Sequence, residues 1–205
     1  MNDQKRTVGT SDKMKAKDFI TLGIFTVLFF AVYMVCVFAS AVTVVTYAFC
    51  SAIAAIPGGI IYMFMLVKIP KAWSILLSGV VIGLLEFLCG AGWIVALSFI
   101  LGALVAELTS KTGKYKSFWK NTVGYALYMC VVSVGTFLPM IMMTDYIDSM
   151  TASNGVEAAY MERVYNLVSG PMMIVIAIVT FIGGVLGALL AKELFKKHFQ
   201  KAGIV

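Results

Sequence analysis

Six long apolar runs constrain the fold of this 205-residue chain more than any other feature of its sequence. A helix needs about 20 apolar residues to cross the roughly 30 Å of hydrocarbon in a bilayer, and each run comes close to or exceeds that length. Hydrophobic residues make up 61% of the chain and charged residues 13%, against about 45–50% and about 25% in soluble domains. We therefore predict an all-α integral membrane protein with six transmembrane helices, over about residues 18–40, 42–67, 72–89, 91–110, 117–143 and 170–195.

The division between the third and fourth runs depends on Cys89-Gly90-Ala91-Gly92, which we interpret as a turn. One long buried hairpin with a re-entrant tip is the alternative at this point. In the second run, Pro57-Gly58-Gly59 predicts a kink or a close approach of another backbone.

The basic residues predict how the helices are oriented. Fifteen of the sixteen Lys and Arg residues lie near the start of the first run, between the second and third, around the junction of the fourth and fifth, or at the end of the sixth. These positions fall at every second connection between predicted helices, so they lie on the same side of the membrane. The positive-inside rule predicts that this side is the cytoplasm. Residues 1–17 and 198–205 are then cytoplasmic tails of a membrane domain over 18–197. The net charge of +6 fits anionic lipid headgroups, and we expect no nucleic-acid partner.

The segment 144–169 is the long polar connection on the other side. It holds four of the ten acidic residues of the chain and a single basic one, Arg163. Asn154 and Glu157 have the spacing of an N-cap and N3 pair, so we predict one short outer helix over 155–168 between the fifth and sixth transmembrane helices. This helix would form a lid over a pocket built by the third to sixth helices.

The residues that usually perform catalysis are scarce. The single histidine, His198, lies in the basic C-terminal region, and the sequence has no phosphate-binding loop. The four cysteines lie in apolar runs without a CxxC pair, so a disulfide framework or zinc site is not expected. We predict a protein that is not an enzyme and has no cofactor and no metal.

Two acidic residues lie inside apolar runs, where a charge costs a few kcal/mol or more. Glu107 is near the inner end of the fourth run, and we expect it to pair with Lys111 four residues later. Glu86 has no basic neighbour in the sequence. It either forms a structural hydrogen bond to another helix or binds a ligand or a proton.

Aromatic and methionine residues gather at the predicted outer ends of the helices. An interfacial aromatic belt with flexible core filler is one interpretation. The other is an adaptable apolar pocket for an organic ligand, with Glu86 and with these candidates: Trp93, Tyr125, Tyr128, Met140, Tyr146, Tyr165 and Asn166.

Small residues recur at four-residue spacing, as in Gly183-x-x-x-Gly187-x-x-x-Ala191, and allow helix backbones to approach closely. Most such stripes should serve internal packing, and one could dock another membrane subunit.

Two stretches carry a resemblance to a known family: KAKDFITLGIFTVLFFAVY at 15–33 and GGVLGALLAKELFKKHFQKAGI at 183–204. With the six-helix layout, they resemble the substrate-binding S components of energy-coupling factor (ECF) transporters, in the MptD or Trep_Strep group. The resemblance implies a subunit of the bacterial cytoplasmic membrane that captures a vitamin or similar micronutrient near the outer face. It also implies docking on a transmembrane T component that is coupled to two cytoplasmic ATPases.

The docking face implied by the resemblance lies on the first helix. The family often has Ala-x-x-x-Ala there, and this chain has Gly23-x-x-x-Val27-x-x-x-Ala31, so Val27 departs from the pattern. Two other functions compete with substrate capture. A stand-alone channel or secondary transporter usually has inverted repeats and midplane polar groups, which we do not find. A membrane scaffold without a ligand is the other alternative.

Overall fold

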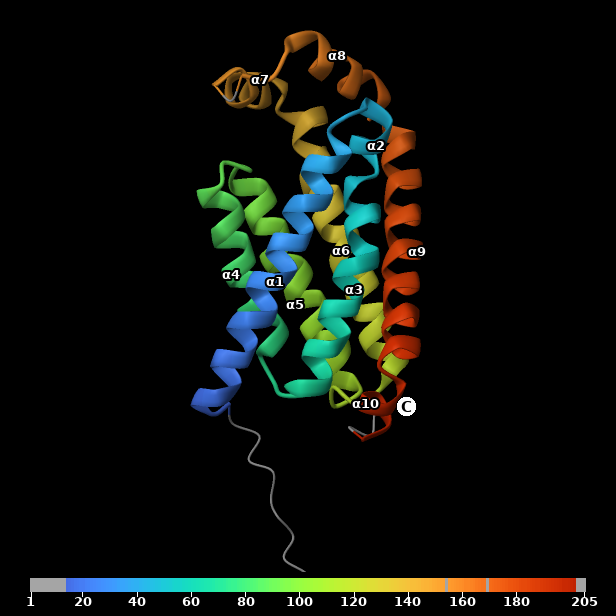
Figure 1. Ribbon diagram of the computed structural model, residues 1–205. Coiled ribbons are helices and arrows are strands. Elements are labelled where there is room, and N and C mark those ends of the chain that lie inside the picture. Colours follow the sequence, from blue (N-terminus) through green and yellow to red (C-terminus); the bar gives the residue numbers. More distant parts are fainter. Residues whose placement is uncertain (1–13, 154, 169, 202–205) are drawn as a thin grey trace, which may run out of the picture.

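The structure is a computed structural model that describes residues 14–153, 155–168 and 170–201 (Figure 1). The described residues form helices joined by short connections, and no strand occurs among them. The helices are α1 (Ala16–Ser40), α2 (Val44–Ala48), α3 (Cys50–Lys68), α4 (Ser74–Leu88), α5 (Trp93–Thr112), α6 (Phe118–Met142), α7 (Thr144–Ser153), α8 (Ala158–Leu167), α9 (Gly170–Leu194) and α10 (Lys196–Lys201).

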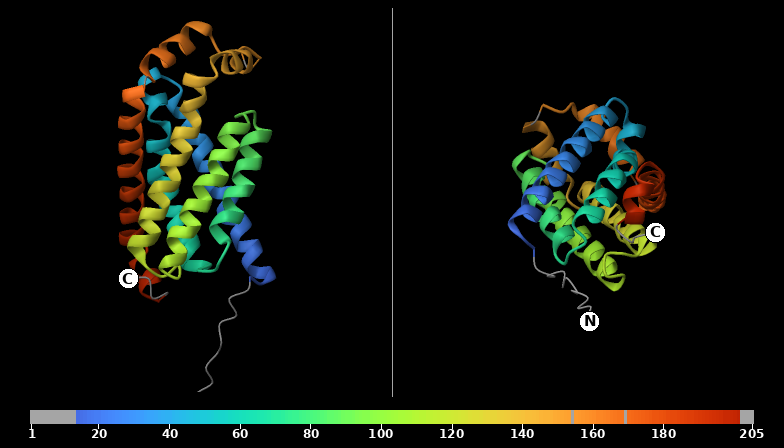
Figure 2. Two further views of the ribbon diagram at one scale, coloured as in Figure 1. Left: turned by 180° about the vertical axis from the view of Figure 1, so that it is seen from behind. Right: turned by 60° about the horizontal axis from the view of Figure 1, so that its bottom comes forward.

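Six of these helices, α1, α3, α4, α5, α6 and α9, stand side by side in one bundle and alternate in direction (Figures 1 and 2). The most extensive contacts join α5 with α6 and α4, and α9 with α3 and α6, while α1 packs on α3. The short helices α2, α7 and α8 lie at one end of the bundle, and α10 lies at the other. The connections rich in lysine, together with the start of α1 and the end of α9, share the α10 end.

Five helices of the bundle are long and apolar enough to cross a membrane, and α4 is a shorter apolar helix of 15 residues. The turn at Cys89–Gly92 separates α4 from α5 as predicted, with Gly90 and Gly92 at positive φ. The protein is thus an all-helical membrane protein with five candidate spans in its described residues, one fewer than the sequence predicts.

The second apolar run is broken, which the sequence analysis missed. It forms α2 and α3, which meet at Phe49, instead of one helix over 42–67. The side chain of Thr43 accepts a hydrogen bond from the backbone nitrogen of Thr46 and starts α2. Thr46 in turn donates to the Ser40 carbonyl at the end of α1. These hydroxyl contacts fix a short helix where hydropathy alone shows a continuous run.

Small residues hold the bundle together through close backbone approach. A Cβ atom on Gly59 of α3 would lie 2.8 Å from the backbone of Gly187 on α9, and one on Gly183 would lie 2.7 Å from the Ala52 carbonyl. The stripe on α9 therefore packs inside the molecule, and Pro57-Gly58-Gly59 marks the close approach that the sequence predicts. These contacts position the α3–α9 pair.

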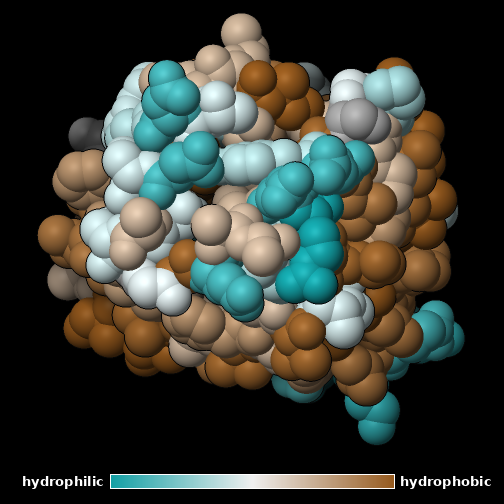
Figure 3. Space-filling model, turned by 90° about the horizontal axis from the view of Figure 1, so that it is seen from above, coloured by the Kyte–Doolittle hydropathy of each residue, from teal (hydrophilic) through white to brown (hydrophobic). Residues whose placement is uncertain are grey.

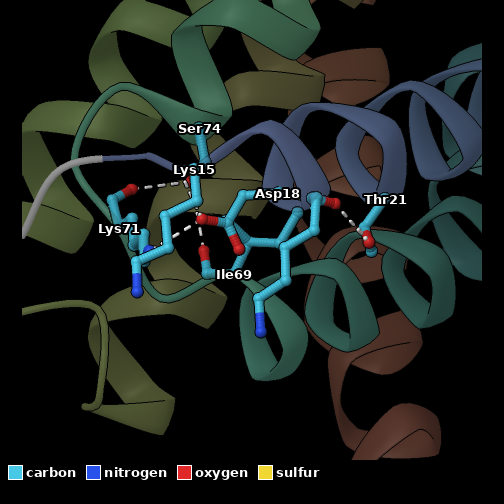
Figure 4. A network of polar contacts seen from close by, with 7 residues as sticks. Lys15, Asp18, Thr21, Ile69, Lys71 and Ser74 are labelled. Atoms are coloured by element: carbon cyan, nitrogen blue, oxygen red, sulfur yellow. Dashed lines mark hydrogen bonds and ion pairs between the residues drawn. The ribbon is translucent and has the colours of Figure 1, made fainter. Parts of the chain in front are cut away.

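A polar network ties α1 to the connection between α3 and α4 (Figure 4). The Lys71 ammonium lies 2.7 Å from the carboxylate of Asp18, which also accepts a hydrogen bond from the Lys15 backbone nitrogen at 2.7 Å. Deeper in the bundle, Thr26 of α1 donates to Ser78 of α4. The position of α1 against α4 is thus fixed at two levels.

Glu107 does not form the predicted pair with Lys111 among the ion pairs of the described residues. Its carboxylate instead accepts hydrogen bonds from the backbone nitrogens of Trp73, Ile75 and Leu76, at 2.7, 3.1 and 3.3 Å. The first backbone N–H groups of a helix have no partner within the helix, and a negative charge there is favoured by the helix dipole. Glu107 is therefore the cap of α4.

The polar connection between α6 and α9 forms two helices, α7 and α8, which we call the lid helices. The prediction of one helix over 155–168 missed α7 and placed the start of α8 too early. Glu157 occupies the N-cap position of α8 without a side-chain cap, whereas the predicted cap, Asn154, lies outside the described residues. The lid helices are nevertheless amphipathic, with Ile147, Met161 and Val164 buried beneath them.

Candidate ligand-binding site

A cavity of about 560 Å³ lies at the end of the bundle beneath the lid helices. Its walls come from the C-terminal half of α1, from α2 and the start of α3, from the α4–α5 turn and from α6. Seen from above, hydrophilic side chains gather on this end of the molecule, and hydrophobic side chains surround its flanks (Figure 3). The volume is within the range of about 300–1,000 Å³ typical of small-molecule pockets.

Glu86 is the most unusual residue in the cavity wall. It lies near the end of α4, its side chain is 1% exposed, and its Oε1 atom has no hydrogen-bond partner among the described residues. A buried polar group without a partner is costly and rare. The sequence left two possibilities for Glu86: a structural hydrogen bond to another helix, or the binding of a ligand or a proton. The structure shows no hydrogen bond of Oε1 to another helix in the part of the chain that it describes.

Aromatic rings form much of the wall. Tyr33 and Phe38 enter from α1, Tyr47 from α2, and Tyr146 and Tyr160 from the lid helices. The Tyr160 hydroxyl donates to the Ala41 carbonyl at 3.1 Å, and its ring lies 6.3 Å from that of Tyr47. The contact between α8 and α2 therefore closes one side of the cavity with packed aromatic side chains.

Thioethers and acidic groups complete the lining. Met34, Met140, Met150 and Met161 contribute flexible, polarisable side chains that adapt to a bound shape. Glu157 adds a second carboxylate at the lid. The described residues that line the cavity include no Lys, Arg or His.

The floor of the cavity is closed by the aromatic core of the bundle. Tyr33 packs edge-on against Phe99, with ring centroids 5.1 Å apart, and Phe99 packs in turn against Tyr128. Below them, a void of about 10 Å³ bordered by Tyr62 and Tyr128 is large enough for about one water molecule. The cavity therefore opens toward the lid end, and packed side chains separate it from the lysine-rich end.

The residues proposed from the sequence fall into two groups. Glu86, Met140 and Tyr146 line the cavity together. Five others are not among the lining residues: Tyr125 and Tyr128 lie in the core, Trp93 and Asn166 are exposed, and Tyr165 is half-buried on α8, where it packs against the neighbouring hydrophobic cluster.

Two of these outlying residues have other partners. The Tyr125 hydroxyl donates to the Ala55 carbonyl at 2.9 Å and joins α6 to α3. The Tyr165 hydroxyl donates to Asp148 at 2.7 Å and joins the two lid helices. Burial and then this hydrogen bond raise the pKa of the Tyr165 phenol, so the link between the lid helices persists at physiological pH.

Sequence reasoning missed Tyr33 and Tyr47, because it built the pocket from the third to sixth predicted helices alone. Both are phenols inside apolar runs, and that is the signal that could have identified them. Thr136, one turn before Pro139 on α6, is a further lining residue that was missed.

The lid rests on the α4–α5 turn at one glycine. A Cβ atom on Gly92 would lie 3.2 Å from the Tyr146 hydroxyl and 3.3 Å from the Met150 sulfur. Gly92 also has a φ of +83°, which residues with a side chain rarely adopt. A glycine at this position allows α7 to close directly against the turn.

The predicted docking residues Gly23, Val27 and Ala31 lie on the exposed face of α1. No atom lies within 4 Å of a Cβ position built on Gly23. Gly23 therefore has no neighbour at its Cβ position in the described part of the molecule, unlike the glycines of α9.

The described residues contain no group of three or more His, Cys, Asp or Glu side chains that could hold an ion. All four cysteines are free thiols.

Comparison with known proteins gives a family. The chain matches no curated protein and no solved structure. The model of the Trep_Strep family, described as a hypothetical bacterial integral membrane protein, matches residues 16–201, which includes the whole bundle, the cavity and the lid. The chain belongs to the Trep_Strep family of bacterial integral membrane proteins.

Proposed function

We propose that the protein is a non-catalytic substrate-capture subunit of an ECF-type importer, which binds a micronutrient in the cavity beneath the lid helices. The observation that carries the proposal is a cavity of about 560 Å³ that contains a buried carboxylate oxygen without a partner. A protein that served only as a scaffold would have no need to keep such a costly group in its interior. In a binding protein, the ligand supplies the missing hydrogen bond and offsets the free-energy cost of burying the carboxylate oxygen.

The proposed topology has six crossings, with α4 as the third, and both termini in the cytoplasm. It rests on the alternating directions of the bundle helices and on the lysines that gather at the α10 end. The lid helices and the cavity then face outward, where a nutrient is captured.

The closed floor favours a subunit that needs partners over a stand-alone channel. Tyr33, Phe99 and Tyr128 separate the cavity from the lysine-rich end, so a ligand cannot pass through the bundle as it stands. Delivery would require movement of the whole subunit or of its helices. We assign the energy for this movement to a T component and two ATPases, with the Gly23, Val27 and Ala31 face as the docking surface.

The test is co-purification from bacterial membranes. The tagged full-length protein is extracted in mild detergent and should bring down a T component and two ATPases in fixed ratio, together with a small molecule visible by native mass spectrometry. Recovery of the chain without these proteins, combined with ligand uptake by the chain alone in liposomes, would replace the proposal with a secondary transporter. Recovery with neither partners nor a ligand would leave only a scaffold.

A further inference from the structure

The charges around the cavity restrict which ligand it can take. Glu86 lies in the wall, 1% exposed, and Glu157 lies at the lid. Arg163, the single basic residue of the outer segment, is exposed on α8, where its Nε atom donates to the Ala159 carbonyl. The described lining therefore carries two carboxyl groups and no basic side chain.

The buried carboxylate discriminates between ligands of different charge. An ionised carboxylate is an acceptor only, so Glu86 Oε1 needs a donor. An anionic ligand would be repelled by buried Glu86 in a setting of low dielectric constant, and more weakly by the exposed Glu157 at the lid. A neutral ligand would supply at most a hydrogen bond and no counter-charge. A cationic nitrogen that carries a hydrogen satisfies both the charge and the acceptor.

The remaining lining fits the body of such a ligand. Tyr47, Tyr146 and Tyr160 offer aromatic faces and edges, and aromatic faces attract cations. The methionines of α1, α6 and the lid helices provide adaptable apolar contact. The volume of about 560 Å³ admits one molecule of the size of a vitamin.

We infer that the ligand is an organic cation: a flat, largely apolar body that bears at least one protonated nitrogen, which donates a hydrogen bond to Glu86. This inference rests on the proposed capture function and specifies its substrate class. Glu86 is its charge-selecting residue, and the tyrosines hold the body of the ligand.

The experiment uses the full chain in lipid nanodiscs and a panel of ring compounds, each in three charge states. One such series is tryptamine, tryptophol and 3-indolepropionate, and a second is tyramine with its alcohol and carboxylate counterparts. Binding is measured by calorimetry at pH 7. The amines should bind about tenfold or more tightly than the alcohols, the factor expected when a charge-assisted hydrogen bond replaces a neutral one. The carboxylates should not bind.

Two variants complete the test. Glu86→Gln preserves the size of the side chain and should remove the preference for amines. The variant should remain folded, because the amide that replaces the carboxyl group is uncharged and needs no counter-charge. Glu157→Gln, at an exposed position, should change the preference much less. Equal binding of carboxylates, an unchanged preference in Glu86→Gln, or no binding by either series would each overturn the inference.

Native mass spectrometry of the purified chain separates this inference from the proposed function. A co-purified cation supports both. A co-purified anion overturns the assigned substrate class and leaves substrate capture intact. If no molecule co-purifies and no compound binds, both are overturned.

Discussion

The carboxylate of Glu107 lies 2.7 Å from the backbone nitrogen of Trp73, which precedes the first residue of α4. The same carboxylate accepts hydrogen bonds from two further backbone nitrogens of α4 and from the Tyr115 hydroxyl. One buried acid thus joins α5, the start of α4 and the turn after α5. The helix that carries Glu86 is held at its lysine-rich end by Glu107.

We expect Glu107→Ala to destabilise the protein, because buried donors at the start of α4 would lose their acceptor. Each buried group left unsatisfied costs about 1–3 kcal/mol, so a clear drop in the melting temperature should follow. The measurement is thermal unfolding in detergent. Lys111→Ala is the control, because the sequence predicted that residue as the partner. A drop of the same size for Lys111→Ala would contradict the capping role.

The lid contact at Gly92 gives a second prediction with a matched control. Gly92→Ala and Gly90→Ala both place a side chain at a positive φ, but only Gly92 packs against Tyr146 and Met150. Both variants should lose similar stability from backbone strain. Gly92→Ala alone should also release bound ligand several-fold faster, because α7 cannot close fully. Dissociation rates of the co-purified ligand provide the measurement, and equal rates for the two variants would remove Gly92 from the lid contact.

The exposed face of α1 gives a third prediction. Gly23→Leu should leave folding and ligand affinity unchanged, because nothing lies within 4 Å of the added Cβ. It should reduce uptake in cells and co-purification of the T component. Val35→Leu, on an exposed part of the same helix, is the control and should preserve both. Normal uptake by Gly23→Leu would exclude this stripe as the docking surface.

Orientation can be checked with the chain's own thiols. Cys89 is exposed in the α4–α5 turn, at the lid end. In a variant in which Cys36, Cys50 and Cys130 are replaced by Ala, a membrane-impermeant maleimide should label Cys89 in intact cells. In the same background without Cys89, Lys116→Cys at the opposite end should be labelled only after permeabilisation. The reverse pattern would invert the proposed topology.

The sequence predicted the helices correctly where the length of an apolar run alone decides whether a long helix forms. Five of the six predicted runs contain the five long helices, which have 19 to 25 residues, and the glycines after Cys89 ended α4 as expected. The break at Phe49 was missed because no glycine or proline marks it. It depends on hydroxyl contacts of Thr43 and Thr46, which hydropathy does not reveal.

The site was only partly predictable, because sequence spacing does not give depth within a bundle. Glu86 was recognisable as an acid without a sequence neighbour, and the structure places it in the cavity wall. Tyr125 and Tyr128 have the same residue type as Tyr33 and Tyr47, yet they lie in the core of the bundle and do not line the cavity. The hydrogen bonds of Glu107 come from backbone atoms more than 30 residues earlier in the chain, which no local pattern indicates.

The shortness of α4 has a consequence for the surrounding lipid. At roughly 1.5 Å per residue its 15 residues extend about 22 Å, less than the roughly 30 Å of a bilayer's hydrocarbon core. A membrane adapts to a short apolar segment by local thinning. The tip of the α4–α5 hairpin also lies lower than the outer ends of the neighbouring helices (Figure 1). We therefore expect the outer leaflet to dip beside α4, which brings headgroups and water to the level of Glu86.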